Sequence, residues 1–196
     1  MCGICGIVYS NRDKQVDHDV LGLMSKSLLH RGPDSHDSWF SHGIGFAHRR
    51  LIILDVTSTS KQPMIDSQTG VVITYNGEIY NYIEIRKKLI DRGHNFTSTG
   101  DTEVLLRAYI EWKYDLFTEI NGMFAFSIYD PRDNTVFFAR DYFGQKPLFY
   151  YHYEEGIIFS SELNSLIKNR TIPHDIDKEA ISEYLLYDTF VQQKFL

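Results

Sequence analysis

Four short segments in the second half of the chain constrain its fold more than any other feature. They cover residues 123–129, 136–140, 148–153 and 157–160, and they are rich in the aromatic and β-branched side chains that favour strands. Only a few residues join each segment to the next. Links of that length connect antiparallel neighbours, because parallel strands need a crossover of a dozen or more residues. The second half therefore predicts consecutive antiparallel strands.

The first half mixes further strands with amphipathic helices. Further strands are expected at residues 4–9, 38–41, 44–48 and 71–75. Asp19 is expected to cap the first helix, which must end before Gly32-Pro33. Later helices are expected at residues 81–92, 101–112, 162–167 and 177–186. Helices grouped apart from consecutive antiparallel strands indicate an α+β sandwich, in which two sheets pack together and the helices lie outside.

Composition narrows the class of protein. The 196 residues fit one domain, and 43% of them are hydrophobic, which is enough to form a core. A net charge of −6 argues against nucleic acid or an anionic membrane as a partner. No apolar run reaches the ~18 residues of a membrane span, and no basic region precedes the short apolar N-terminus as in a signal peptide. Two cysteines without a signal indicate a reducing compartment, so we expect a cytoplasmic protein.

The first residues, Met1-Cys2-Gly3, offer a compact chemical unit. Removal of the methionine would leave Cys2 with both a nucleophilic thiol and a free α-amine, whose pKa near ~8 suits a base at neutral pH. Two other interpretations are an accidental cysteine in an apolar strand and a redox Cys-x-x-Cys motif with Cys5. Three positions is an odd step along a strand, so the two thiols are expected on opposite faces, which disfavours a disulfide. A zinc site would need further ligands at metal-type spacing, and none is found.

Four residues in later parts of the chain could complete a site for such a nucleophile. Asn76-Gly77 could direct a side-chain amide and a backbone N–H at one oxyanion, although Asn-Gly is also the commonest hairpin turn. Arg50 lies between apolar residues and could bind a carboxylate, or it could form an ion pair with Asp34 or Asp55. Asp101 could face a substrate ammonium group, or it could cap a helix. These residues together suit the two charged ends of an α-amino acid.

The chain resembles a known family, the class II glutamine amidotransferase domains of the N-terminal nucleophile hydrolases. The order and spacing of its motifs are most similar to the N-terminal half of glutamine-hydrolysing asparagine synthetases. The motifs that carry the resemblance are Cys2-Gly3-Ile4, His30-Arg31-Gly32-Pro33-Asp34, Ala47-His48-Arg49-Arg50-Leu51, Tyr75-Asn76-Gly77-Glu78-Ile79-Tyr80-Asn81, Asp101-Thr102-Glu103-Val104, Asn121-Gly122-Met123-Phe124-Ala125-Phe126, Lys146-Pro147-Leu148 and Ser161-Glu162-Leu163.

The resemblance implies a four-layer αββα sandwich over residues 1–196, with two antiparallel sheets flanked by helices. It also implies hydrolysis of glutamine to glutamate and ammonia. By matching position, Cys2 would be the nucleophile, with its freed α-amine as the general base. Asn76 and Gly77 would form the oxyanion hole and also contact the substrate.

The resemblance further implies a substrate pocket. Arg50 would bind the substrate carboxylate, and Glu78 and Asp101 would face its α-amino group. The backbone around Ile53 and Leu54 would complete the pocket. No cofactor or metal is expected for glutamine hydrolysis.

In the family, the ammonia passes to a C-terminal synthetase domain that uses ATP and Mg²⁺ to amidate aspartate. We therefore expect the natural chain to continue past Leu196 into such a domain, and the resemblance suggests a homodimer. Two alternatives remain open at the level of sequence. The acceptor of the ammonia could be another carboxylate, or this fold could be a catalytically idle module that binds a partner domain.

Overall fold

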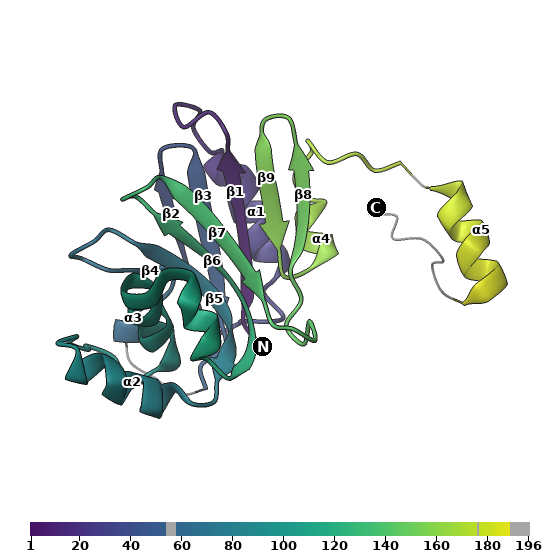
Figure 1. Cartoon of the computed structure of the whole chain (residues 1–196). Helices are drawn as coiled ribbons and strands as arrows, with labels where there is room; N and C mark the ends of the chain where they lie inside the picture. The colour runs from purple at the N-terminus through teal and green to yellow at the C-terminus, as the bar shows by residue number, and fades with distance from the viewer. Residues whose placement is uncertain (54–57, 176, 189–196) are drawn as a thin grey trace.

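The computed structural model describes residues 1–53, 58–175 and 177–188, and its centre is a pair of stacked antiparallel sheets (Figure 1). The five-stranded sheet contains, in spatial order, β2 (Ser35–Ser41), β3 (Ile44–Arg50), β1 (Gly3–Tyr9), β9 (Gly156–Ser160) and β8 (Phe149–Tyr153). The four-stranded sheet contains β4 (Met64–Ile65), β5 (Val72–Ile79), β6 (Gly122–Asp130) and β7 (Thr135–Arg140).

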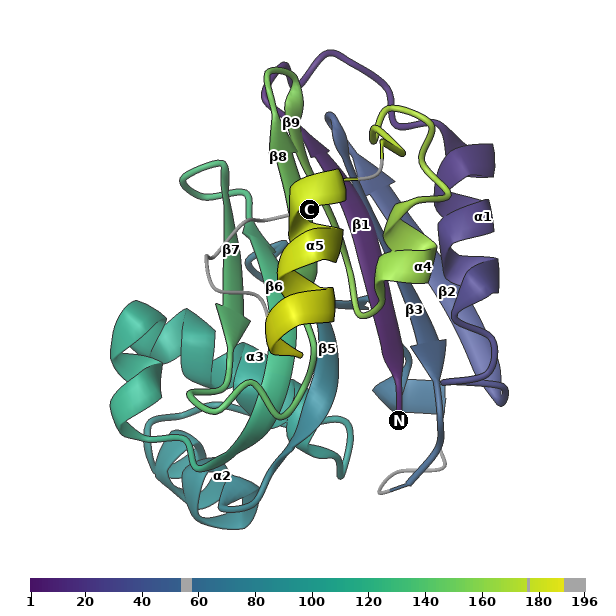
Figure 2. The same ribbon diagram turned by 90° about the vertical axis from the view of Figure 1, so that its right-hand side faces the viewer.

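Helices cover the outer face of each sheet (Figure 2). Those on the five-stranded sheet are α1 (His18–Ser27) and α4 (Leu163–Leu166). Those on the four-stranded sheet are α2 (Tyr82–Asp91), α3 (Asp101–Trp112) and the 3₁₀ helix η2 (Lys113–Thr118). The short 3₁₀ helix η1 (Ser58–Ser60) precedes β4, and α5 (Lys178–Tyr187) stands clear of the sandwich in Figure 1. The predicted α+β fold of four layers is confirmed.

Side chains of β1 show how a strand serves two cores at once. Cys5, Ile7 and Tyr9 pack beneath α1, whereas Ile4 and Val8 lie between the two sheets. This is the alternation expected of a strand buried on both faces. Cys2 shares the parity of Ile4 and not that of Cys5, so the thiol that precedes the strand faces the second sheet.

Asn76-Gly77 does not form a turn. The sequence places a strand only up to Tyr75, but β5 continues to Ile79 and pairs with β6 along its whole length, including Gly77 with Phe124. A partner strand of nine residues holds β5 extended past the dipeptide, and this pairing overrides the local turn preference. The hairpin interpretation of Asn76-Gly77 is therefore wrong.

Two other local expectations also need correction. Asp17, and not Asp19, caps α1, because its carboxylate accepts hydrogen bonds from the backbone N–H groups of Asp19 (2.8 Å) and Val20 (3.1 Å). The short link after β7 does not close a hairpin, since β7 and β8 belong to different sheets. None of the helices in the described ranges is long and apolar enough to cross a lipid bilayer.

Candidate active site

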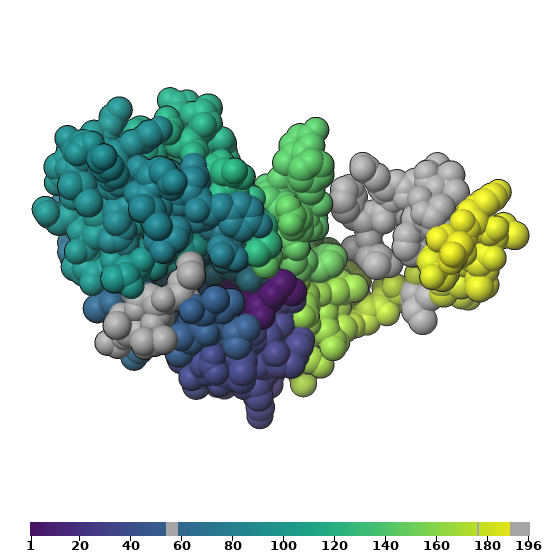
Figure 3. Space-filling model, turned by 90° about the horizontal axis from the view of Figure 1, so that it is seen from below, coloured from purple at the N-terminus to yellow at the C-terminus, as the bar shows by residue number. Residues whose placement is uncertain are grey.

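A small cavity of about 70 Å³ lies where the N-terminal end of β1 meets the four-stranded sheet. In the view from below, the purple N-terminal residues reach the surface between the blue and green segments (Figure 3). The cavity brings together five separate segments of the chain. Its walls are formed by Cys2, Arg50, Leu51, Ile53, Ser60, Gln62, Tyr75, Gly77, Gly100, Asp101 and Thr102.

Cys2 is held on both its backbone and its side chain. The Arg31 Nε donates to the Cys2 carbonyl at 2.9 Å, and Arg31 itself is fixed by Glu162 at 2.9 Å. The Leu51 N–H donates to the Cys2 Sγ at 3.4 Å, and the thiol lies 3.6 Å from the Leu51 carbonyl. Burial raises the pKa of the Cys2 thiol, although the Leu51 N–H, the positive N-terminus and Arg50 oppose this rise. A thiol held neutral in this way needs a base before it can attack.

Asp101 is the first residue of α3, and its side chain does not cap the helix. The capping position is Gly100, and the Asp101 Oδ2 instead accepts hydrogen bonds from the Tyr75 hydroxyl (2.7 Å) and the Ile79 N–H (3.0 Å). Burial raises the pKa of Asp101, and the nearby charge of Glu78 raises it further. The structure thus places a buried carboxylate on the cavity wall, tied to β5.

Arg50 is nearly buried, with 9% of its surface exposed, and lies on the same wall. Its charge lowers the pKa of Cys2, so the guanidinium and the thiol share one electrostatic environment. The Asp34 carboxylate, one of the two expected partners of Arg50, accepts a hydrogen bond from the Ile52 N–H at 2.8 Å. The other expected partner, Asp55, lies outside the described residues, as does the predicted pocket residue Leu54. Ile53 lines the cavity with 71% of its surface exposed.

Gly77 lies on the cavity wall and cannot carry a side chain there. A Cβ at this position would lie 2.4 Å from the Met123 carbonyl oxygen and 2.5 Å from the Tyr75 ring. Asn76 is 2% exposed, and its amide nitrogen has no hydrogen-bond partner within the described part of the chain. A buried N–H without an acceptor is costly unless a ligand supplies one. Asn76 therefore presents a donor that no group in the described part of the chain uses.

The predicted site residues do not all reach the cavity. Cys2, Arg50, Ile53, Gly77 and Asp101 line it, whereas Asn76 is buried and is not among the lining residues. Glu78 is half-exposed and also off the wall, close enough for its charge to act on Asp101.

Six wall residues had no predicted role, namely Leu51, Ser60, Gln62, Tyr75, Gly100 and Thr102. Leu51 contributes backbone groups, which leave no trace in residue type. Tyr75 directly precedes Asn76, and its polar ring inside an apolar strand is the one sequence signal that could indicate a wall residue.

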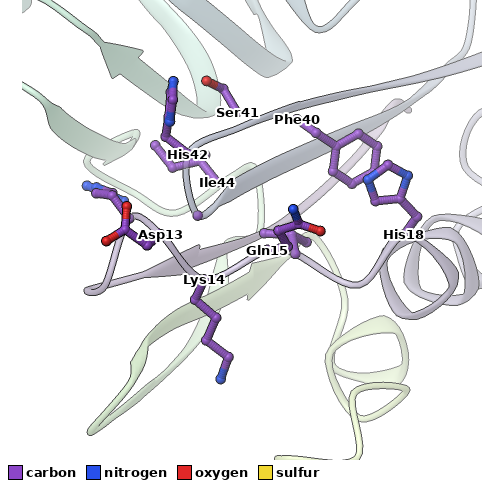
Figure 4. A pocket seen from close by; sticks show the side chains of 11 residues that line it. Asp13, Lys14, Gln15, His18, Phe40, Ser41, His42 and Ile44 are labelled. Atoms are coloured by element: carbon purple, nitrogen blue, oxygen red, sulfur yellow. The ribbon is translucent and has the colours of Figure 1, made fainter.

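A larger hollow of about 420 Å³ lies on another part of the surface, between the residues after β1 and the β2–β3 turn. Figure 4 shows the His18 and Phe40 rings face to face, with centroids 3.8 Å apart, while the Lys14 side chain extends away from the other labelled groups. Lys14 forms an ion pair with Glu155 at 2.7 Å. This hollow contains no cysteine thiol, so the smaller cavity at Cys2 is the candidate site despite its size. Among the described residues, no cluster of histidine, cysteine or acidic side chains is placed to bind a metal.

Comparison with known proteins gives a consistent result for the whole chain. A family model described as a glutamine amidotransferase domain matches residues 1–196. Asparagine synthetase [glutamine-hydrolyzing] 3 of Bacillus subtilis is 39% identical over 185 residues, which is 93% of this chain and 30% of that protein. Asparagine synthetase [glutamine-hydrolyzing] 1 of Arabidopsis thaliana is 35% identical, over 85% of this chain and 28% of that protein. The chain thus spans about 30% of the length of such relatives.

A solved structure supports the fold independently. The glutamine phosphoribosylpyrophosphate amidotransferase of B. subtilis, complexed with ADP and GMP, superposes with a TM-score of 0.69. The alignment covers 85% of this chain and 43% of that protein at 18% sequence identity. At this level of identity the likeness concerns the arrangement of helices and strands alone.

Proposed function

The chain belongs to the glutamine amidotransferase domain family, and we propose that it hydrolyses glutamine to glutamate and ammonia through a thioester on Cys2. The observation that carries this proposal is the position of Cys2. It follows the initiator methionine and lies in one cavity with a buried cation, a buried carboxylate and a glycine N–H. Met1 is 53% exposed, so a methionine-removing peptidase has access to it. Its removal frees the α-amine beside the thiol.

The charges of the cavity suit the backbone end of glutamine. Arg50 would pair with the substrate carboxylate through its planar guanidinium. Asp101 would accept the α-ammonium group, with Glu78 adding negative charge from behind the wall. The backbone at Ile53, and at Leu54 beyond the described residues, would complete this end of the pocket. A glutamine held at both charged groups presents its side-chain amide to Cys2.

The chemistry then follows from the groups on Cys2. The α-amine takes the thiol proton, and the thiolate sulfur attacks the amide carbon to form a tetrahedral oxyanion. The Gly77 N–H and the Asn76 side-chain amide would donate hydrogen bonds to that oxyanion. The protonated amine returns its proton to the amide nitrogen, and ammonia leaves with formation of the thioester. Water, activated by the same amine, attacks the thioester and releases glutamate and the thiol.

In the full-length protein, we propose that the ammonia serves a C-terminal synthetase domain that amidates aspartate with ATP and Mg²⁺. The names of the relatives and the share of their length that this chain covers support this proposal. The amidotransferase step itself needs no cofactor. A homodimer and a cytoplasmic location are further proposals, which size-exclusion chromatography and cell fractionation of the full-length protein test.

Release of ammonia tests the proposed function directly. We expect protein that lacks Met1 to convert glutamine to equal amounts of glutamate and ammonia without ATP. Protein of identical sequence that retains Met1, obtained by blocking the peptidase, is expected to be at least about 10²-fold slower, since its Cys2 nitrogen is an amide and cannot act as a base. Equal rates for the two forms, or no ammonia from either, would contradict the proposal.

A second prediction concerns Asp101. An ammonium group pairs only with the ionised carboxylate, and burial raises the pKa of Asp101 above its usual value. We therefore expect the KM for glutamine to rise as the pH falls through this raised pKa. Asp101→Asn is expected to raise the KM about 10–100-fold at neutral pH and to remove this pH dependence, because a charged hydrogen bond is lost.

The free energy of unfolding distinguishes a substrate-binding role of Asp101 from a structural one. A carboxyl group whose pKa is raised on folding stabilises the fold below its unfolded pKa, and this contribution is lost as the pH rises through the folded pKa. The free energy of unfolding of Asp101→Asn at neutral pH should therefore equal or exceed that of wild type. Asp133→Asn, which changes an exposed carboxylate remote from the cavity, serves as the control. A KM within about threefold of wild type would contradict the role of Asp101.

A further inference from the structure

Among the described residues, no strand pairs with the cavity-facing edge of β5 from Thr74 onwards. β4 pairs only with Val72 and Ile73, through Ile65 and Met64. Pro63 stands next in register and has no N–H to continue the ladder. From Thr74 onwards, the backbone groups on this side of β5 must therefore find other partners or stay unpaired.

Alternation along the strand shows which groups are concerned. In an antiparallel strand, the N–H and C=O of one residue point to the same side, and those of the next residue point to the other. Phe124 of β6, which lies opposite Gly77, directs its N–H and C=O at Asp141, away from β5. Gly77 and β6 thus form a non-hydrogen-bonded pair. The N–H groups of Tyr75, Gly77 and Ile79 all point to the open edge.

Side chains replace the missing strand at two of these three residues. The Gln62 Oε1 accepts the Tyr75 N–H at 2.6 Å, and the His48 Nε2 donates to the Tyr75 carbonyl at 3.1 Å. The Asp101 Oδ2 accepts the Ile79 N–H at 3.0 Å. Gly77 lies between these two residues on the cavity wall, and no group in the described part of the chain accepts its N–H, which is therefore open to a ligand.

We propose that His48 and Gln62 are positioning residues for the oxyanion hole. The Tyr75 carbonyl and the Asn76 N–H belong to one rigid peptide plane, so the His48 hydrogen bond sets the direction in which Asn76 and then Gly77 leave that plane. Gln62 fixes the preceding plane and is held in turn by the Thr102 hydroxyl at 3.2 Å. Neither side chain needs to touch the substrate. This inference rests on the proposed function.

The surroundings of His48 keep its ring in the neutral form that donates a hydrogen bond through Nε2. His48 comes from β3 of the other sheet, is 1% exposed, and reaches across the sandwich to β5. Burial and the charge of Arg50 together lower the pKa of His48 to about 3, although the hydrogen bond to the Tyr75 carbonyl opposes this shift, so the ring is neutral at physiological pH. Because the Tyr75 carbonyl can only accept, the proton of the neutral ring lies on Nε2.

Kinetics of four variants in Met1-free protein test this inference. His48→Phe removes the donor, and we expect kcat to fall about 10–100-fold with KM within about threefold, since a misdirected oxyanion donor weakens only the transition state. His48→Gln places an amide N–H at a similar reach and is expected to recover kcat to within about fivefold of wild type. Phe46→Leu, a fully buried change on the same face of β3, is expected to lower Tm without lowering kcat.

Gln62→Met provides a second arm if His48→Phe does not fold, and it should lower kcat in the same way. A tetrahedral mimic adds a readout that a purely structural role would not move. The γ-aldehyde of glutamate adds to a thiol and presents an oxyanion. Its affinity for the variants should therefore fall in proportion to their kcat, while the affinity of glutamate should stay that of wild type.

If wild type hydrolyses glutamine, a wild-type kcat in His48→Phe would overturn this inference and leave the proposed function standing. If His48→Phe does not fold, a wild-type kcat in Gln62→Met would have the same meaning. Equal losses of kcat in His48→Phe, His48→Gln and Phe46→Leu would also overturn it, because a general loss of packing would then explain the effect. Wild-type protein that releases no ammonia would contradict the proposed function and, with it, this inference.

Discussion

Replacement of Cys2 by alanine in protein that lacks Met1 is expected to lower kcat for glutamine hydrolysis by at least about 10⁴-fold. The free α-amine and the cavity remain in this variant, but no atom is left to form the thioester. Since Cys2 is only partly buried and the variant keeps the hydrogen bond from Arg31 to its backbone carbonyl, loss of the weak thiol contacts with Leu51 should change the free energy of unfolding little. The rate is measured as ammonia release, and the stability by urea denaturation.

Cys5→Ala is the matched control for this experiment. The Cys5 thiol is buried beneath α1 on the opposite face of β1, where burial raises its pKa to about 12. We expect this variant to keep kcat within about threefold of wild type and to lose about 1 kcal/mol of stability, as a small buried side chain is truncated. Comparable loss of activity in both cysteine variants would point to a fold effect or to a redox pair, and would contradict the assignment of Cys2 as nucleophile.

Removal of the Asn76 amide should produce the second largest effect. Asn76→Ala is expected to lower kcat about 10²–10³-fold while KM changes little, because an oxyanion-hole donor acts on the transition state and not on bound substrate. The buried amide nitrogen has no partner within the described residues, so its removal leaves no donor or acceptor of the protein unsatisfied. Steady-state kinetics on Met1-free protein measure both constants.

Thr74→Val controls for disturbance of the strand. Thr74 lies two residues before Asn76, on the same face of β5, and its buried hydroxyl also lacks a partner within the described residues. An isosteric apolar replacement there is expected to leave kcat unchanged and to preserve or raise the free energy of unfolding. A large fall in kcat for Thr74→Val, or a rise in KM alone for Asn76→Ala, would contradict the role of Asn76 in the oxyanion hole.

Much of the fold follows from local sequence signals. The aromatic and β-branched segments of the second half correspond to β6, β7, β8 and β9, with bounds that differ by one residue where they differ at all. The amphipathic segments at 81–92 and 101–112 correspond to α2 and α3. Such signals are strong here because the strands and helices of the sandwich place their apolar side chains in three buried layers.

Other features depend on contacts between distant segments, and residue types alone do not reveal them. The link after β7 carries the chain from one sheet to the other, although its length suits a hairpin equally well. Asn76-Gly77 has the composition of a turn, yet pairing with β6 keeps it extended. Leu23 lies in the amphipathic helix α1 but is 55% exposed, because the face of α1 that packs on the sheet carries Leu21, Met24 and Ser25.

The candidate site likewise contains residues that the sequence reveals and contacts that it does not. Charged residues near the motifs, such as Arg50 and Asp101, are found from sequence, because a buried charge needs a functional or structural reason. The contacts of the Leu51 backbone with the thiol and of Gln62 with Tyr75 arise only when separate segments meet.

Mass spectrometry of the N-terminal peptide tests the central claim most directly. Met1-free protein is mixed with glutamine, quenched in acid within the first turnover, and digested. We expect the peptide that begins at Cys2 to carry one γ-glutamyl group, labile to hydroxylamine as a thioester is, while the peptide of Cys2→Ala carries none. A glutamyl group on any other residue, or steady ammonia release with no adduct on Cys2 at any quench time, would contradict the account.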